Sequence, residues 1–334
     1  MDSSISRARG LTLSCARRRT LCCSSASSGD SSKFTVGTLD CPAVRSVEEW
    51  ESQGAYHELL GHRIFVLDQP AVRERGAPLL VLHGFPSCSF DWRHVLDAFA
   101  AEQRVVLLDV LGYGLSAKPD QAYSLFEQAD IVEALARELH IDEVVLVTHD
   151  MGDSVGGELL ARSLDTTLPF AVSRRVLANG SVYMDLAQLS GGQQFLLGLP
   201  DECLPEPDAP TGELFKAGLG ATFGAGTPAS AEELDAQWEL CVRNGGNRLM
   251  PRLIRYIEER HRHEPRWTGA IESHPAPLTI VWGDADPIAV WPMAERLHQR
   301  RPDSTLVRLE AIGHYPMIET PNEFALGALA GVSS

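Results

Sequence analysis

The sequence lacks three features that would assign it to familiar classes of protein. None of its 334 residues fall in a run of ~18 consecutive apolar residues, so no membrane span is predicted. A formal net charge of −16 argues against nucleic acid and other polyanions as partners. The seven cysteines show no C-x-x-C spacing, which argues against a metal site or disulfide framework and favours a reducing compartment. With 44% hydrophobic and 22% charged residues, the composition is typical of a globular protein.

The N-terminal segment differs in composition from the rest of the chain. Residues 1–33 hold six basic and two acidic residues, a net charge of +4, together with ten serines and three cysteines. Such a segment resembles an organelle transit peptide, and a disordered tail is the alternative. The first interpretation places the protein in a chloroplast or mitochondrion, and the second in the cytoplasm. We exclude this segment from the fold prediction.

The remaining chain alternates short apolar runs with helical patterns. Its apolar, β-branched runs are apolar at consecutive positions, which is typical of strands covered on both faces. A helical spacing of apolar residues over 124–140 follows one such run, and 56–67 has the pattern of a hairpin with Gly61 at its turn. This alternation predicts a mostly parallel α/β sheet. The six predicted strands are 78–82, 104–110, 143–147, 175–179, 278–282 and 305–309.

The alternation stops in one long stretch. Between about 183 and 275 the sequence is helical, with loops rich in glycine and proline. Ser230 and Glu233 form a capping-box pattern that opens one helix, and a second helix is predicted at about 251–262. We therefore predict a core at 34–182 and 276–334, with a helical cap inserted at 183–275.

The strand at 143–147 leads into a tight turn around Asp150. The residues His149-Asp150-Met151-Gly152 and the later Gly156 give a strand, a sharp turn with small residues, and a helix, which is the nucleophile-elbow pattern. Small residues are needed because the turn is strained and its backbone lies close to neighbouring segments. The alternative is that Asp150 only caps the helix that follows.

Three further motifs follow other predicted strands. His83-Gly84-Phe85-Pro86 comes after the first of them, where hydrolases of this topology place a second oxyanion N–H donor. Asp286 follows the strand at 278–282, and His314 follows the strand at 305–309. Nucleophile, acid and histidine therefore occur in the chain order of the α/β-hydrolase triad. Open α/β sheets bind ligands at the carboxyl ends of their strands, where all these motifs fall.

The chain resembles the α/β-hydrolases of the epoxide hydrolase and haloalkane dehalogenase superfamily, whose nucleophile is an aspartate. Within it, the sequence is similar to the mesoderm-specific transcript protein group from about residue 48 to 332. The motifs that carry this resemblance are 83–86 with Asp91-Trp92, 108–116, 149–153, Asn179-Gly180, 243–247 and 256–267.

The resemblance implies a role for each matching residue. Asp150 would attack an electrophilic carbon and form an ester, and His314 would activate water against that ester, oriented by Asp286. Asp284 is the alternative acid. The backbone N–H groups of Phe85 and Met151 would form the oxyanion hole.

His149 and His83 are expected to be structural residues. His149 would order the elbow, and His83 would hold the loop that contains Phe85.

Some positions depart from the patterns of this superfamily. Haloalkane dehalogenases hold the halide with a tryptophan beside the nucleophile, where this chain has Met151. Epoxide hydrolases use two cap tyrosines to protonate the leaving alkoxide; Tyr256 matches the second by its surroundings, or it is a packing residue. Tyr183, the other tyrosine of the cap, lies too near its start. Trp92 and Trp267 either line the substrate pocket or belong to the core.

One motif points to a different class of protein. Residues 112–117 match the dinucleotide fingerprint G-x-G-x-x-A, but Pro119 prevents a helix from starting there to receive a pyrophosphate. We therefore predict an enzyme without cofactor or metal that hydrolyses a small apolar molecule, with an epoxide the leading substrate. A haloalkane dehalogenase-like hydrolase and a non-catalytic binding protein with this fold are the alternatives. The oligomeric state is left open.

Overall fold

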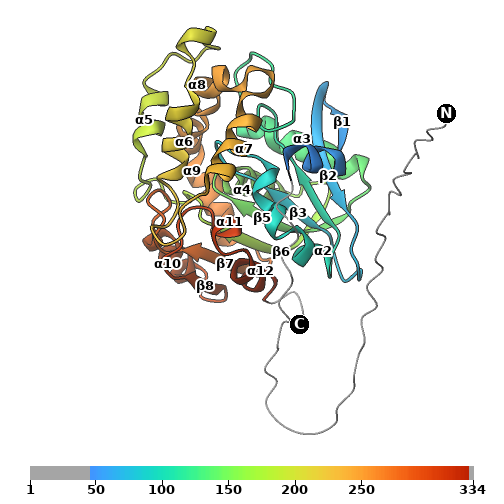
Figure 1. The fold of residues 1–334 in the computed structure, drawn as a ribbon. Coiled ribbons are helices and arrows are strands. Elements are labelled where there is room, and N and C mark those ends of the chain that lie inside the picture. The colour runs from blue at the N-terminus through green and yellow to red at the C-terminus, as the bar shows by residue number, and fades with distance from the viewer. Residues whose placement is uncertain (1–45, 331–334) are drawn as a thin grey trace, which may run out of the picture. The chain divides into compact units, whose positions relative to one another are not determined.

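The structure is a computed structural model that describes residues 46–330. The basic segment 1–33 and both interpretations of it lie outside the described residues. The described residues belong to one compact unit, built around an eight-stranded sheet of order β1-β2-β4-β3-β5-β6-β7-β8 (Figure 1). Strand β2 pairs antiparallel with β1 and β4, and the other neighbouring strands are parallel. The mostly parallel sheet is therefore as predicted.

The six predicted parallel strands are β3 to β8. Every residue of β3, β4 and β7 is buried, as expected of strands covered by helices on both faces. The predicted hairpin is formed by β1 and β2, and its turn residues Leu60 and Gly61 both have positive φ, of 53° and 85°. The strands are β1 (Ala55–Leu59), β2 (His62–Gln69), β3 (Leu79–Leu82), β4 (Val105–Leu108), β5 (Glu143–His149), β6 (Ala171–Ala178), β7 (Leu278–Gly283) and β8 (Thr305–Leu309).

The helices outside the cap lie before, between and after the strands. The helix predicted at 124–140 is α3, and the Ser124 side chain caps it by accepting a hydrogen bond from the Phe126 N–H at 3.1 Å. Within residues 46–330, no helix is both long and apolar enough to cross a membrane. The helices outside the cap are α1 (Val47–Gln53), η1 (Ser89–His94), α2 (Leu96–Ala100), α3 (Leu125–Glu138), α4 (Met151–Leu164), α10 (Trp291–Arg300), α11 (Pro316–Glu319) and α12 (Pro321–Leu329).

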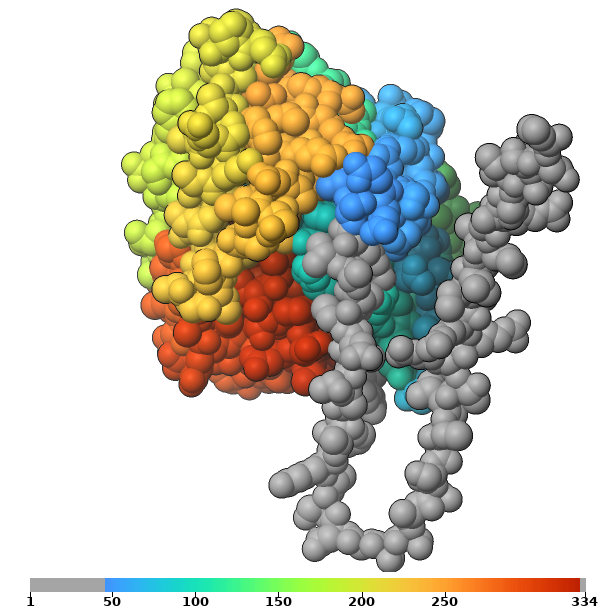
Figure 2. Space-filling model, viewed as in Figure 1, coloured from blue at the N-terminus to red at the C-terminus, as the bar shows by residue number. Residues whose placement is uncertain are grey.

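The chain between β6 and β7 is a helical insertion, as predicted, and we keep the word cap for residues 183–275. In Figure 2 its yellow and orange surface adjoins the red surface of the C-terminal strands and helices. Its elements are α5 (Gly191–Leu197), η2 (Glu206–Asp208), α6 (Gly212–Gly220), α7 (Ala231–Val242), η3 (Arg243–Leu249), α8 (Met250–Leu253) and α9 (Tyr256–Ser273).

Two local predictions for the cap need correction. The single helix expected at 251–262 is divided into α8 and α9, and α9 continues through Pro265 to Ser273. At α7 only half of the capping box forms: the Ser230 hydroxyl accepts from the Glu233 N–H at 3.1 Å. The Glu233 carboxylate instead forms a buried ion pair with Arg93 of η1, which competes for the same oxygens. This ion pair joins the cap to the core.

The last cap helix packs directly on the helix that follows Asp150. A Cβ added at Gly157 of α4 would lie 2.9 Å from the Cβ of Trp267 of α9. No side chain fits at this crossing, so the two helices approach closely. Helix α9 therefore reaches from the cap to the core layer beside β5.

Candidate active site

Asp150 occupies a strained turn between β5 and α4. Its φ is 49° and its ψ is −113°, a conformation that residues with a side chain rarely adopt. A Cβ added at Gly84 would lie 2.5 Å from the Asp150 Cβ, and one at Gly152 would lie 2.7 Å from the Leu82 carbonyl oxygen. The small residues of both motifs are therefore required by close backbone packing. The Asp150 side chain forms no capping hydrogen bond with α4, which rules out the capping interpretation.

The Asp150 carboxylate is buried and is held by the loop after β3. Its Oδ2 accepts a hydrogen bond from the Phe85 N–H at 2.9 Å. Met151, the other predicted oxyanion residue, is the first residue of α4, so its N–H lies at the positive end of that helix. One carboxylate oxygen thus already lies at a backbone donor, where negative charge is favoured.

Asp286 is the partner of His314, and Asp284 is not. The His314 Nδ1 donates to the Asp286 Oδ2 at 2.7 Å, and both groups are buried. The same carboxylate accepts from the N–H groups of Ile288 and Ala289 and from the Asn179 side chain. Asp284 instead pairs with Arg308 at 2.7 Å on the surface side. Four donors fix the Asp286 carboxylate, so the imidazole it orients has one defined position.

The charges around His314 set its protonation. Burial lowers the pKa of His314, but the charges of Asp286 and Asp150 and the hydrogen bond to Asp286 outweigh this and raise it to about 9. The imidazole is therefore protonated at neutral pH. Loss of the Asp150 charge would remove one of the causes that raise the pKa of His314.

The two other histidines of the motifs are structural, as expected. Burial, with the nearby His314 charge, lowers the pKa of His149 to about 3, so His149 is neutral and its Nε2 donates to the His314 carbonyl at 2.8 Å. His83 bonds through its Nδ1 to the Gly84 carbonyl and accepts at Nε2 from the Val110 N–H at 3.0 Å. Both rings thus brace the loops that carry Asp150, His314 and Phe85.

Tyr256 lies at the start of α9, beside Phe85. Its ring centroid is 5.5 Å from that of Phe85, and it is buried. Burial and the Asp150 charge raise the pKa of Tyr256 above its usual value, while Arg260 and a hydrogen bond with the Gln193 side chain lower it. Tyr183 lies elsewhere, and its hydroxyl donates to Glu272 at 2.8 Å. The structure therefore brings one of the two cap tyrosines to the site.

The structure does not bring Trp92 and Trp267 to the cavity, which corrects the expectation that they line the substrate pocket. Trp92 is buried behind the site among Phe99, His149 and Phe324. Trp267 packs where α9 crosses α4, and its Nε1 donates to the Glu158 carboxylate at 2.9 Å. The core interpretation applies to both rings because each is used in packing between secondary-structure elements.

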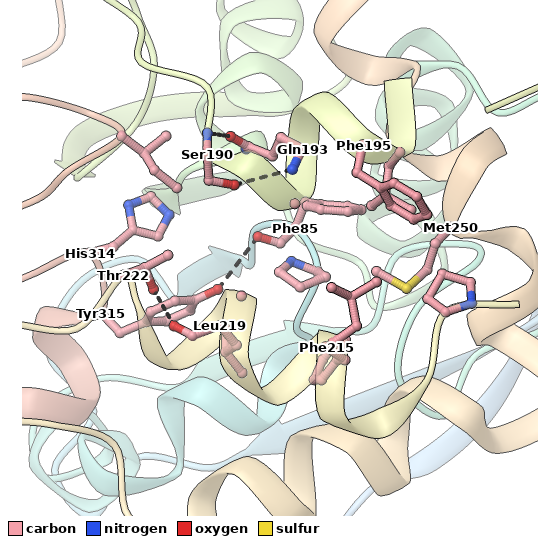
Figure 3. A pocket seen from close by; sticks show the side chains of 17 residues that line it. Phe85, Ser190, Gln193, Phe195, Phe215, Leu219, Thr222, Met250, His314 and Tyr315 are labelled. Atoms are coloured by element: carbon pink, nitrogen blue, oxygen red, sulfur yellow. Dashed lines mark hydrogen bonds between the residues drawn. The ribbon is translucent and has the colours of Figure 1, made fainter. Parts of the chain in front are cut away.

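An apolar cavity of about 590 Å³, part of it open solvent, adjoins the site (Figure 3). His314 and Phe85 belong to its wall, so Asp150 lies one hydrogen bond behind that wall. The other lining residues come mostly from the cap: Ser190, Gly192, Gln193, Phe195, Leu196, Pro210, Leu214, Phe215, Gly218, Leu219, Thr222 and Met250, with Pro86, Ile288 and Tyr315 from the core.

One residue of this site, Arg260, was not predicted from the sequence. Arg260 of α9 is buried; its Nη2 donates to the Asp150 carbonyl at 3.1 Å and its Nε to the Ser154 hydroxyl at 2.6 Å. Its charge also lowers the pKa of Asp153, which burial raises to about 8. Arg260 stands in a run of charged residues that looks like an exposed helix face, so no local signal distinguishes it.

The glycine-rich loop after β4 holds a carboxylate and not a phosphate site. The Asp109 carboxylate accepts from the N–H groups of Ser89 and Leu115 at 2.8 and 2.7 Å. The next helix, α3, begins only at Leu125. No helix starts at Lys118, as Pro119 predicts. Among residues 46–330, no group of three or more histidine, cysteine, aspartate or glutamate side chains is placed to hold a metal ion.

Comparisons with known proteins agree with this architecture. The model of the alpha/beta hydrolase family matches residues 79–326. LipZ of Mycobacterium tuberculosis, a protein named as a hydrolase, is 41% identical over 286 residues, which is 85% of this chain and 97% of LipZ. The human mesoderm-specific transcript homolog protein is 33% identical over 302 residues, covering 88% of this chain and 89% of that protein. The resemblance to this group is confirmed.

A solved structure supports the same fold. The alpha/beta hydrolase fold protein from Burkholderia ambifaria aligns with a TM-score of 0.66 at 25% identity, covering 83% of this chain and 97% of that one. The predicted architecture, a mostly parallel sheet flanked by helices with a helical insertion, is therefore confirmed.

Proposed function

This chain belongs to the alpha/beta hydrolase family, and we propose that it hydrolyses an apolar epoxide through a covalent ester on Asp150, without a cofactor. One observation carries the proposal. Asp150 is at the strained elbow with its Oδ2 on the Phe85 N–H at 2.9 Å, beside a histidine already paired with Asp286. This arrangement leaves Oδ1 as the nucleophilic oxygen, and Oδ2 becomes the ester carbonyl oxygen.

In the first step Oδ1 attacks an epoxide carbon and the ring C–O bond breaks. The leaving oxygen remains attached to the substrate as an alkoxide and takes the proton of the Tyr256 hydroxyl. Burial and the Asp150 charge raise the pKa of Tyr256 and so keep its hydroxyl protonated before the attack, and Arg260 and Gln193 partly offset this rise. The products of the step are a hydroxyalkyl ester on Asp150 and a tyrosinate.

In the second step water cleaves the ester. Esterification removes the Asp150 charge, one of the causes that raise the pKa of His314 to about 9. The protonated His314 gives its proton to the tyrosinate and becomes neutral. The neutral imidazole then takes a proton from water as the water attacks the ester carbon. The N–H groups of Phe85 and Met151 stabilise the oxyanion on Oδ2. When the intermediate collapses, its new hydroxyl proton passes to the leaving substrate oxygen, which releases the diol and restores the Asp150 carboxylate and the protonated His314.

The position after the nucleophile favours an epoxide over a haloalkane. The Met151 sulfur accepts a hydrogen bond from the Tyr113 hydroxyl at 3.3 Å, so this side chain offers no N–H donor to a departing halide. Tyr256 offers an O–H donor, which an alkoxide needs and a halide does not. The non-catalytic alternative has less support, because Asp150, Asp286 and His314 are all present in bonded geometry.

A single turnover in oxygen-18 water tests the proposal. With enzyme in excess over epoxide, the ester route puts an unlabelled Asp150 oxygen into the diol and the label into the Asp150 carboxylate. Peptide mass spectrometry should therefore find one oxygen-18 in the peptide that contains Asp150. Label in the diol from the first turnover would mean direct attack by water. Failure to turn over any epoxide or haloalkane would favour the binding-protein alternative.

A further inference from the structure

Apart from the protonated His314, which is paired with Asp286, the wall of the cavity carries no charged side chain. None of its 17 lining residues is an aspartate, glutamate, lysine or arginine, although these make up 22% of the chain. A charged group placed along the cavity away from His314 would lose its hydration without gaining a counter-ion. The cavity therefore selects against charged substrates.

Most polar side chains in the wall are already bonded within the protein. Ser190 and Gln193 bond to each other's backbone N–H groups, at 2.9 and 3.2 Å, in a capping box of α5. The Thr222 hydroxyl donates to the Leu219 carbonyl at 2.7 Å, and the Tyr315 hydroxyl donates to the Phe85 carbonyl at 3.4 Å. Figure 3 shows these bonds as dashed lines. The wall thus offers a ligand mainly apolar contact.

The cavity leads from His314 and Phe85 to the surface of the cap. Its inner wall holds His314 and Phe85, whereas Phe195 of α5 and Leu214 of α6 line it and are also 48% and 44% exposed. Because these two side chains belong to both the cavity wall and the surface, the cavity opens between α5 and α6. Large apolar side chains exposed at a pocket opening indicate a ligand that covers them.

We propose that the substrate carries a long, uncharged hydrocarbon chain, with its electrophilic carbon at Asp150 and its chain running outward between α5 and α6. The apolar wall supplies the affinity for the chain, and Phe195 and Leu214 cover the part that leaves the protein. This inference rests on the proposed function, because it takes Asp150 as the point of attachment.

Gly218 of α6 gives a direct way to shorten the cavity. It lines the wall, and a Cβ added there would meet nothing within 4 Å, so the backbone at this position accepts a side chain, and we expect Gly218→Leu to occupy cavity space. Gly269 of α9 is a matched control: it is also a helical glycine with open space at its Cβ, and it does not line the cavity. Replacing glycine in a helix raises helix propensity at both sites.

The experiment measures kcat/KM for terminal epoxides from four to sixteen carbons. In the unmodified protein and in Gly269→Leu, each methylene buried should raise kcat/KM about three- to fourfold until the chain reaches the opening. Gly218→Leu should lower the ratio of long-chain to short-chain kcat/KM at least tenfold. Equal kcat/KM for all chain lengths, or the same loss in Gly218→Leu for all of them, would overturn the inference.

The failures of the two proposals are distinguishable. If short and long epoxides label Asp150 equally well in a His314→Gln variant, the ester route stands and the chain-binding inference fails. If no epoxide of any length labels Asp150, the proposed function fails, and with it the point from which the chain would extend.

Discussion

The carboxyl ends of the strands and the cap are built in different ways. At the carboxyl ends of the strands, hydrogen bonds hold the side chains of Asp150 and His314, and the backbone leaves no room for a Cβ at Gly84 and Gly152. In the cap, the surfaces around the cavity are apolar side chains from short helices. The comparison indicates that the core holds Asp150, Asp286 and His314 in place, whereas the cap forms most of the cavity wall.

The two regions are nevertheless joined at the nucleophile. Arg260 of the cap donates to the Asp150 carbonyl, and Tyr256, one helical turn earlier, packs on Phe85. A second connection lies at α7, where Glu233 pairs with Arg93. Because buried ion pairs and hydrogen bonds break at a high cost, the cap is expected to keep its place on the core during turnover.

Asp150→Ala should give the largest effect. If the core alone supplies the nucleophile, epoxide hydrolysis falls at least ~10³-fold while the fold is retained, because the Asp150 side chain does not cap α4. Single-turnover kinetics measure the loss, and circular dichroism checks the fold. Unfolding of the variant would mean that the side chain is needed for the structure of the elbow.

Tyr256→Phe tests the one chemical group that we assign to the cap. The change keeps the ring on Phe85 and removes the proton donor, so alkylation should slow by about tenfold or more, and ester hydrolysis by His314 should not. Rapid-quench kinetics separate the two steps. Unchanged alkylation would show that the proton comes from another group and that the cap supplies no chemistry.

Asp150→Asn examines the electrostatics of the core without changing its shape. The Asp150 charge helps to raise the pKa of His314 to about 9, so the neutral amide should lower that pKa. In the unmodified protein the imidazole is protonated up to about pH 9, and in Asp150→Asn it should lose its proton at lower pH. NMR titration of the His314 ring measures this. An unchanged titration would mean that Asp286 alone sets the charge of His314.

Trp267→Phe should have the smallest effect on catalysis. Trp267 packs between α9 and α4 and not in the cavity, so kcat/KM should stay within about twofold. Loss of the hydrogen bond to Glu158 should lower the free energy of unfolding by about 1 kcal/mol, as urea denaturation can measure. A large change in KM with unchanged stability would return Trp267 to the substrate pocket.

The same contrast explains what could be predicted from the sequence. Asp150, Asp286 and His314 were identified because a strained turn and the carboxyl ends of parallel strands demand recognisable residues at fixed spacing. The positions of Arg260, Trp92 and Trp267 depend on how helices far apart in the chain cross each other. Arg260 bonds to Ser154, 106 residues earlier, and no local pattern encodes that contact.

The central claim is that Asp150 becomes covalently bound to the substrate. His314→Gln keeps a polar side chain at the site but removes the base that activates water, so an ester formed on Asp150 should persist. Incubation of this variant with an epoxide, followed by intact and peptide mass spectrometry, should find one epoxide mass added to the peptide that contains Asp150. An unmodified Asp150 under conditions where the unmodified enzyme turns the epoxide over would contradict the account.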